Sequence, residues 1–160
     1  MKLDQIAYYA HNEAQVASIK TAFGVEDAEW VEDIATGNVV ATSCLTGQIE
    51  SGISKGHLRF NYSLGIELEI LTYLEGPHWH SGKIDFGRGV PFLSHLGFHM
   101  DEGERPPENV LSTGLLVQTM DTTEHTNDYV NSRGRKYHYE IYKMPSGPDL
   151  KYIWRVGGAS

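Results

Sequence analysis

The chain has 160 residues, of which 40% are hydrophobic, and this is enough for one soluble domain with a substantial core. It carries 21 acidic residues against 13 Lys and Arg, for a formal net charge of −8 at pH 7. This balance excludes a general binder of nucleic-acid backbones and disfavours docking on an anionic membrane, because both need clustered basic residues.

The single cysteine, Cys44, cannot form an internal disulfide, and this is typical of a reducing compartment. It lies in an apolar strand pattern, so we expect a buried, inert thiol rather than a nucleophile. The sequence has no apolar run of about 18–20 residues that would span a bilayer, and its N-terminus lacks the apolar stretch of a signal peptide. These features predict a cytoplasmic protein without a membrane partner.

The first elements in chain order are a strand and a helix. Residues 3–10 alternate loosely between apolar and polar types, which favours a strand. Asn12 then provides a helix cap, and Val16, Ile19 and Phe23 recur at the spacing of one helix face.

Strands dominate the next stretch. Residues 38–45 are rich in β-branched types, and residues 64–73 alternate clearly, with apolar side chains on one face. Glu67 and Glu69 share the opposite face of that second strand. A loop is expected over residues 75–82.

The pattern restarts after the middle of the chain. Residues 93–100 match residues 3–10 position by position in kind, with His95 under Gln5. This match suggests an internal duplication within one domain of residues 1–160, with modules of approximately 1–88 and 89–160. The remaining expected elements are a strand near 115–120, a helix over 126–132, and strands over 137–142 and 149–156.

Three short segments carry a family resemblance. They are Leu-Asp-Gln-Ile-Ala at 3–7, Leu-Glu-Ile-Leu-Thr-Tyr at 68–73 and Leu-Ser-His-Leu-Gly-Phe at 93–98. In order and spacing they resemble the vicinal oxygen chelate superfamily, which includes glyoxalases, bleomycin-resistance proteins and ring-cleaving dioxygenases. The resemblance implies an α+β, glyoxalase-like fold, in which two βαβββ modules form an open-barrel cleft.

The resemblance also implies a divalent metal in that cleft. Its ligands would be Gln5, Glu69 and His95, and Glu69 would also serve as the catalytic proton acceptor. One amide oxygen, one carboxylate and one imidazole suit Fe, Mn, Ni or Zn. The family's fourth ligand is usually a glutamate, but Lys151 stands at the aligned position, and an ammonium has no lone pair to offer.

Four further residues are candidates for substrate binding. Lys151 is one, because it would enter the cleft and hold an anionic group. His99 is another, since it follows His95 by four residues on the same strand face. Trp79 belongs to a His-Trp-His tract expected to be an exposed loop, where it would form a lid or rim. His125 precedes the expected helix, where Thr126 or Asn127 could be the cap, so it is either part of a capping loop or a substrate contact.

Two functions follow from this interpretation. The first is a metal-dependent enzyme of the glyoxalase, epimerase or dioxygenase kind, acting on a small oxygen-rich substrate. The alternative is a metal-free protein of the bleomycin-resistance kind that sequesters a small molecule, and Lys151 favours it. A third, weaker hypothesis is an interaction scaffold, because a fold does not dictate a function. For each function we expect a homodimer, as is usual for family members of this size.

Overall fold

A computed structural model describes residues 1–43, 46–80, 91–125 and 136–156. Most of the described chain is sheet. In chain order the elements are β1 (Lys2–Tyr9), α1 (Glu13–Ala22), β2 (Val31–Thr42), β3 (Ile49–Asn61), β4 (Glu67–Glu75), β5 (Phe92–Met100), α3 (Glu108–Thr113), β6 (Leu115–His125), β7 (Lys136–Lys143) and β8 (Leu150–Val156).

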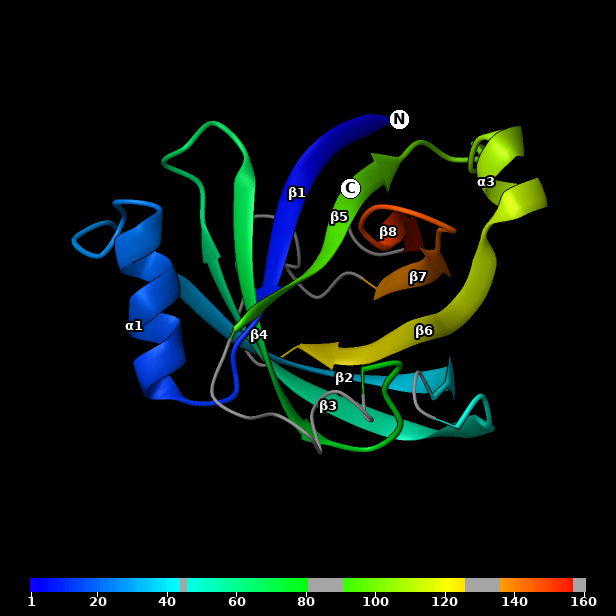
Figure 1. The fold of residues 1–160 in the computed structure, drawn as a ribbon, viewed down its shortest axis with the longest axis horizontal. Coiled ribbons are helices and arrows are strands. Elements are labelled where there is room, and N and C mark those ends of the chain that lie inside the picture. Colours follow the sequence, from blue (N-terminus) through cyan, green and yellow to red (C-terminus); the bar gives the residue numbers. More distant parts are fainter. Residues whose placement is uncertain (44–45, 81–90, 126–135, 157–160) are drawn as a thin grey trace.

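The eight strands form one closed barrel of mixed sheet in the order β1-β4-β3-β2-β6-β7-β8-β5 (Figure 1). Strand β1 runs parallel to β4 and β5 runs parallel to β8, whereas the other pairs are antiparallel. The expected open barrel is therefore wrong. Pairing of β1 with β5 on one side and β2 with β6 on the other closes the sheet and leaves no unpaired edge.

The two halves of the barrel have matching registers. Between β1 and β5, Gln5 pairs with Gly97 and Ala7 pairs with His95, so a twofold exchange of the two strands places Gln5 on His95. The same exchange carries Ala7 onto Gly97. Ala7 pairs with Glu69 on β4, and Gly97 pairs with Lys151 on β8. Glu69 and Lys151 therefore occupy corresponding positions.

Helix α1 packs on the outside of the barrel, as its spacing predicts. The Asn12 side chain accepts a hydrogen bond of 2.9 Å from the Gln15 backbone N–H, which caps the helix as expected. Val16 and Ile19 form a buried cluster with Ile70 of β4. This packing covers the outer face of the first half of the barrel.

The sequence patterns did not predict two elements, and they predicted a third to be shorter than it is. Strand β2 begins at Val31, well before the expected start at residue 38, and β3 was not expected. Besides α1, the described part of the chain contains α3, a six-residue helix after Pro107 with no side-chain cap. Its Val110 packs with Tyr142 and Tyr152 over the second half. The helix expected over residues 126–132 lies outside the described residues.

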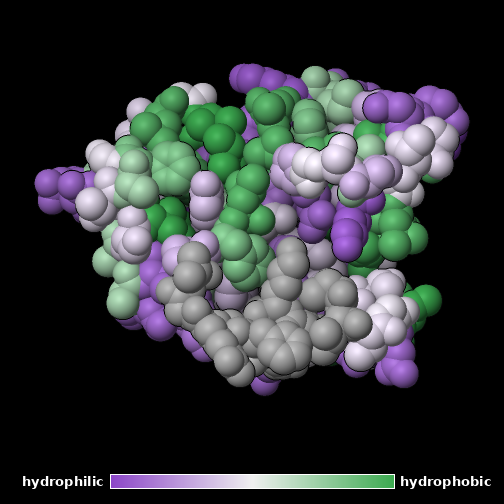
Figure 2. All heavy atoms as spheres, in the orientation of Figure 1, coloured by the Kyte–Doolittle hydropathy of each residue, from purple (hydrophilic) through white to green (hydrophobic). Residues whose placement is uncertain are grey.

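The surface mixes apolar and hydrophilic side chains. On the face seen in Figure 2, apolar residues gather toward the upper left and centre. Exposed apolar side chains include Leu3, Tyr62 and Leu64. No helix in the described part of the chain is long and apolar enough to cross a membrane.

Candidate functional site

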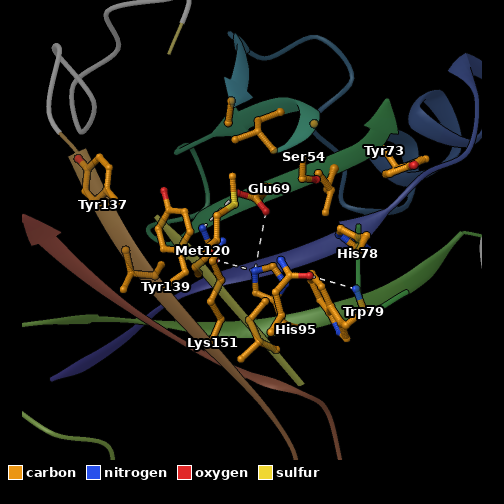
Figure 3. Close-up of a pocket in the computed structure, with 18 of the residues that line it drawn as sticks. Ser54, Glu69, Tyr73, His78, Trp79, His95, Met120, Tyr137, Tyr139 and Lys151 are labelled. Carbon is orange, nitrogen blue, oxygen red and sulfur yellow. Dashed lines mark hydrogen bonds and ion pairs between the residues drawn. The ribbon is translucent and has the colours of Figure 1, made fainter. Parts of the chain in front are cut away.

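The site is a cavity of about 70 Å³ inside the barrel (Figure 3). One set of wall residues is apolar, and comprises Leu58, Phe60, Leu71, Met120, Ile141 and Ile153. The other set is polar, and it includes Gln5, Glu67, Glu69, His95 and Lys151. These polar residues come from β1, β4, β5 and β8, whose inward positions alternate with outward ones.

Gln5, Glu69 and His95 lie together, and all three are almost fully buried. The Gln5 Oε1 atom lies 2.9 Å from Nε2 of His95, and Gln5 Nε2 lies 3.4 Å from Oε2 of Glu69. His95 Nε2 lies 3.8 Å from Oε1 of Glu69. The structure thus brings the three expected ligand residues to one point.

The Gln5 carboxamide links these groups and determines which atoms donate and which accept the hydrogen bonds between them. Its Nε2 donates to both Glu67 and Glu69, so its Oε1 faces His95. An amide oxygen only accepts, and His95 Nε2 therefore carries a proton. Glu67 also accepts a 2.9 Å hydrogen bond from the Tyr62 hydroxyl through its other oxygen. Both carboxylates are thus held by hydrogen bonds from the protein.

A second layer of polar groups extends this series of hydrogen bonds behind His95. The Ser94 hydroxyl lies 3.0 Å from His95 Nδ1 and 3.1 Å from His80 Nε2. With its proton on Nε2, His95 presents Nδ1 as an acceptor to Ser94. Ser94 and His80 are both buried, so they orient the His95 ring from outside the cavity.

Burial controls the ionisation of the cluster. Burial raises the pKa of the Glu69 carboxyl, the Lys151 ammonium opposes this shift, and the Glu67 charge adds to it. Burial likewise lowers the pKa of His95 well below its usual range, and Lys151 contributes in the same direction. The pKa of His78 falls to about 3 for the same two reasons. Both histidines are therefore neutral near pH 7.

Lys151 enters the cavity, as the alternation of β8 predicts. Its ammonium lies over the face of Tyr139, 4.2 Å from the ring centroid, and Ile153 lines the same cavity. Tyr152 points to the opposite side and packs against α3. In the described part of the chain, no ion pair joins Lys151 to Glu69. The lysine therefore stands beside the cluster without neutralising it directly.

Gly97 leaves the space that the Gln5 side chain occupies. A Cβ atom at this position would collide with the Gln5 carboxamide oxygen and with its Cβ. This explains why a strand that faces the cavity carries a glycine between His95 and His99.

His99 lines the cavity, as expected, but it is tied to a neighbour. Its Nδ1 lies 2.7 Å from Oδ1 of Asp4, and both residues also line an outer groove that adjoins the cavity. The backbone of His125 ends β6 opposite Ala35. Its side chain lies outside the described part of the structure, so its expected role stays a prediction.

The His-Trp-His tract is buried, and the expectation of an exposed loop is wrong. The Trp79 backbone N–H donates to Oε1 of Gln118, and its indole N–H donates to Oδ2 of Asp149. Each of these hydrogen bonds is 3.0 Å long. The Trp79 ring packs with Val117 and Ile141, and it lines the cavity wall rather than a surface rim. His78 and His80 are buried beside it.

Gln5, Glu69 and His95 offer three possible metal ligands, but the fourth ligand of the family is missing. Ligand atoms bound to one ion at about 2.1 Å lie about 3.0–3.4 Å apart. His95 Nε2 lies 2.9 Å from Gln5 Oε1 and 3.8 Å from Glu69 Oε1, but the Gln5 atom that faces Glu69 is the amide nitrogen, which cannot bind a metal. Binding would require the His95 proton to move from Nε2 to Nδ1. The family's fourth position holds Lys151, which repels cations. Among the described residues, no group of three or more His, Cys, Asp or Glu side chains is arranged to hold a metal.

Sequence reasoning gave no role in the site to Glu67, Ser94 and His80, and it left open whether Tyr139 lines the cleft or packs in the core. Both Glu67 and Tyr139 lie on predicted strands. Glu67 is two residues from Glu69, so the alternation of that strand already placed both side chains on the same face. Ser94 and His80 had no such signal, because their contact depends on how the loop after β4 folds against β5.

Comparisons with known proteins name no activity. No family model matches the chain, and no curated protein matches it. Among solved structures, a hypothetical protein from Bacillus halodurans has 14% sequence identity and a TM-score of 0.49. The similarity covers 99% of this chain and 97% of that one.

Proposed function

We propose that this protein binds a small molecule in the barrel cavity without a metal ion, as bleomycin-resistance members of the vicinal oxygen chelate superfamily do. The observation that carries the proposal is the place of Lys151. It corresponds to Glu69 in the other half of the barrel, and its side chain lines the same cavity.

The strand order supports the proposed family. In each half a strand and a helix precede three strands, and the halves follow the spatial orders β1-β4-β3-β2 and β5-β8-β7-β6. The three sequence segments that resemble the family lie on β1, β4 and β5, next to one another and around the cavity.

The hydrogen bonding supports binding without metal. An ammonium has no lone pair and repels a cation, so Lys151 opposes an ion at this place. The Gln5 carboxamide donates to both Glu67 and Glu69, and thus gives the buried carboxylates the partners that an ion would otherwise supply.

Metal content and bound ligand test the proposal together. Protein purified without chelator or nickel resin is analysed for metals and by native mass spectrometry, beside a Glu69→Gln variant. We expect far less than one metal ion per chain in both proteins, and a small organic adduct on the wild type. One ion per chain in the wild type and none in Glu69→Gln would overturn the proposal.

The convergence of Gln5, Glu69 and His95 favours a second candidate, a metal-dependent enzyme of the glyoxalase, epimerase or dioxygenase kind. These three residues would hold the ion, which would polarise two adjacent oxygens of a substrate. The Glu69 carboxyl, whose pKa is raised by burial, would exchange a proton with substrate. Activity that appears on adding one metal equivalent, and that Glu69→Gln abolishes, would establish this candidate.

A further inference from the structure

The cavity holds a positive charge on its inner wall, and this feature extends the proposed function on which the following inference rests. Two lysines line the cavity in the described part of the chain. Lys55 is 44% exposed, and its ammonium forms an ion pair with Glu75 at a distance of 3.3 Å. Lys151 is only partly exposed, and it lines the cavity together with the polar cluster. Lys151 is therefore the cation that a bound molecule meets.

The Lys151 ammonium is positioned and still has hydrogen-bond donors to offer. Tyr139 holds it by contact with the ring face, which uses no directional donor of the ammonium. In the described part of the chain no carboxylate forms an ion pair with it. Figure 3 shows Tyr139 and Lys151 side by side, with His95 and Glu69 facing the same space.

Glu69 offers a complementary group in the lining of the same cavity. Its Oε2 accepts from Gln5, while Oε1 lies 3.8 Å from His95, beyond hydrogen-bond length. A hydroxyl on a ligand can donate to this oxygen. If the carboxyl is protonated, it can instead donate to a ligand carbonyl. The neutral rings of His78 and Trp79 add apolar wall rather than charge.

The volume of the cavity limits the ligand. An apolar cavity of about 150 Å³ accommodates benzene, and the cavity here measures about 70 Å³. Benzene has six non-hydrogen atoms, so about six is the upper limit for a ligand in this smaller cavity, and a phenyl substituent exceeds it.

We propose that the cavity binds short-chain carboxylates with an oxygen on the adjacent carbon, that is, 2-hydroxy or 2-oxo acids of two or three carbons. The ligand carboxylate accepts from the Lys151 ammonium, and the adjacent hydroxyl or carbonyl interacts with Glu69. The apolar walls around Leu71 and Ile141 enclose the remaining carbon atoms.

Calorimetric titration with lactate, pyruvate, propionate, lactamide and 3-phenyllactate tests this inference. We expect lactate or pyruvate to bind more tightly than propionate, which lacks the adjacent oxygen, and than neutral lactamide. We expect 3-phenyllactate to bind most weakly because of its size. Lys151→Met should weaken lactate binding by at least about tenfold, and Lys151→Arg should retain most of it. Lys143→Met removes an exposed lysine and is the matched control.

Thermal unfolding of each variant first establishes that it folds. Equal lactate affinity in wild type and Lys151→Met, or the absence of binding by every acid, would overturn the inference. If lactamide binds as tightly as lactate, the cavity binds small molecules as proposed but the ligand class is wrong. If binding of the acids requires an added metal ion, the proposed metal-free function itself fails.

Discussion

Glu69 and Lys151 occupy corresponding positions in the two halves of the barrel, one beside Ala7 and the other beside Gly97. Exchanging the two halves about the pseudo-twofold axis therefore superimposes the acidic Glu69 on the basic Lys151. The difference gives the cavity one carboxyl wall and one ammonium wall, so its two sides have different chemistry although their backbones correspond.

Gly97→Ala tests the close approach of β5 to Gln5. The new Cβ would collide with the Gln5 side chain, so the carboxamide would move and lose its bond to His95. We expect a loss of about 1–3 kcal/mol in the free energy of unfolding, measured in urea. A change within about 0.5 kcal/mol would mean that Gln5 can move aside without cost.

Arg59→Met tests the attachment of α1 to the barrel. Arg59 is 3% exposed, and its guanidinium contacts Glu13 on the helix, Glu32 on β2 and the Thr72 hydroxyl on β4. We expect the variant to lose about 1–3 kcal/mol of unfolding free energy, because these charge-assisted bonds disappear together.

Glu13→Gln is the control for Arg59. The Glu13 side chain is 82% exposed, so its removal should cost less than about 1 kcal/mol. Equal losses in the two variants would show that one surface pair, rather than the buried guanidinium, holds the helix.

His78 should make the protein less stable in acid. Its ring is neutral in the folded state with a pKa of about 3, against 6.5 for the unfolded chain, so the unfolded state binds more protons below pH 6.5. Its contribution to stability is complete above pH 6.5 and falls as pH decreases toward 3. Each such proton is worth about 1.36 kcal/mol per pH unit.

His78→Phe should remove this dependence. The unfolding free energy of the wild type minus that of the variant, measured between pH 4 and 7, should decrease as pH falls, at a rate approaching that of one proton. His11→Phe, on an exposed residue, serves as control. Parallel curves for wild type and His78→Phe would contradict neutral burial of this ring.

The homodimer expected from the family resemblance stays a prediction. Light scattering coupled to size exclusion at micromolar concentration should give twice the chain mass. A mass equal to that of one chain would contradict it.

Local patterns predicted the elements whose signal lies within a few neighbouring residues. The cap and apolar spacing of α1 and the alternation of β4 are of this kind. Strand β3 escaped prediction because small and polar residues such as Ser54 and Gly56 occupy its inward positions beside the cavity. The short helix α3 lacks a side-chain cap, so the sequence marks its start only by prolines.

The site was predicted where it depends on strand register and missed where it depends on a loop. Gln5 and His95 could be found because residues 3–10 match residues 93–100, and Glu69 because its segment resembles that of the family; their strands adjoin in the barrel. The burial of Trp79 could not, because it depends on long-range contacts of the loop after β4 with Gln118 and Asp149. The closure of the barrel likewise depends on pairing between β2 and β6, which no local pattern encodes.

Lys151→Glu should convert the cavity into a better metal site. The carboxylate would restore the fourth ligand at the position that corresponds to Glu69, and it would remove the ammonium that repels cations. We expect calorimetric titration with Mn²⁺, Ni²⁺ and Zn²⁺ to show at least about tenfold tighter binding than in wild type, worth about 1.4 kcal/mol or more. Lys143→Glu makes the same change of charge on an exposed lysine, so it separates a local ligand effect from a change in net charge. Equal metal affinities in wild type and Lys151→Glu would show that residue 151 does not govern cation binding. Equal gains in the two variants would show that the general charge of the protein, rather than the cavity, attracts the ion.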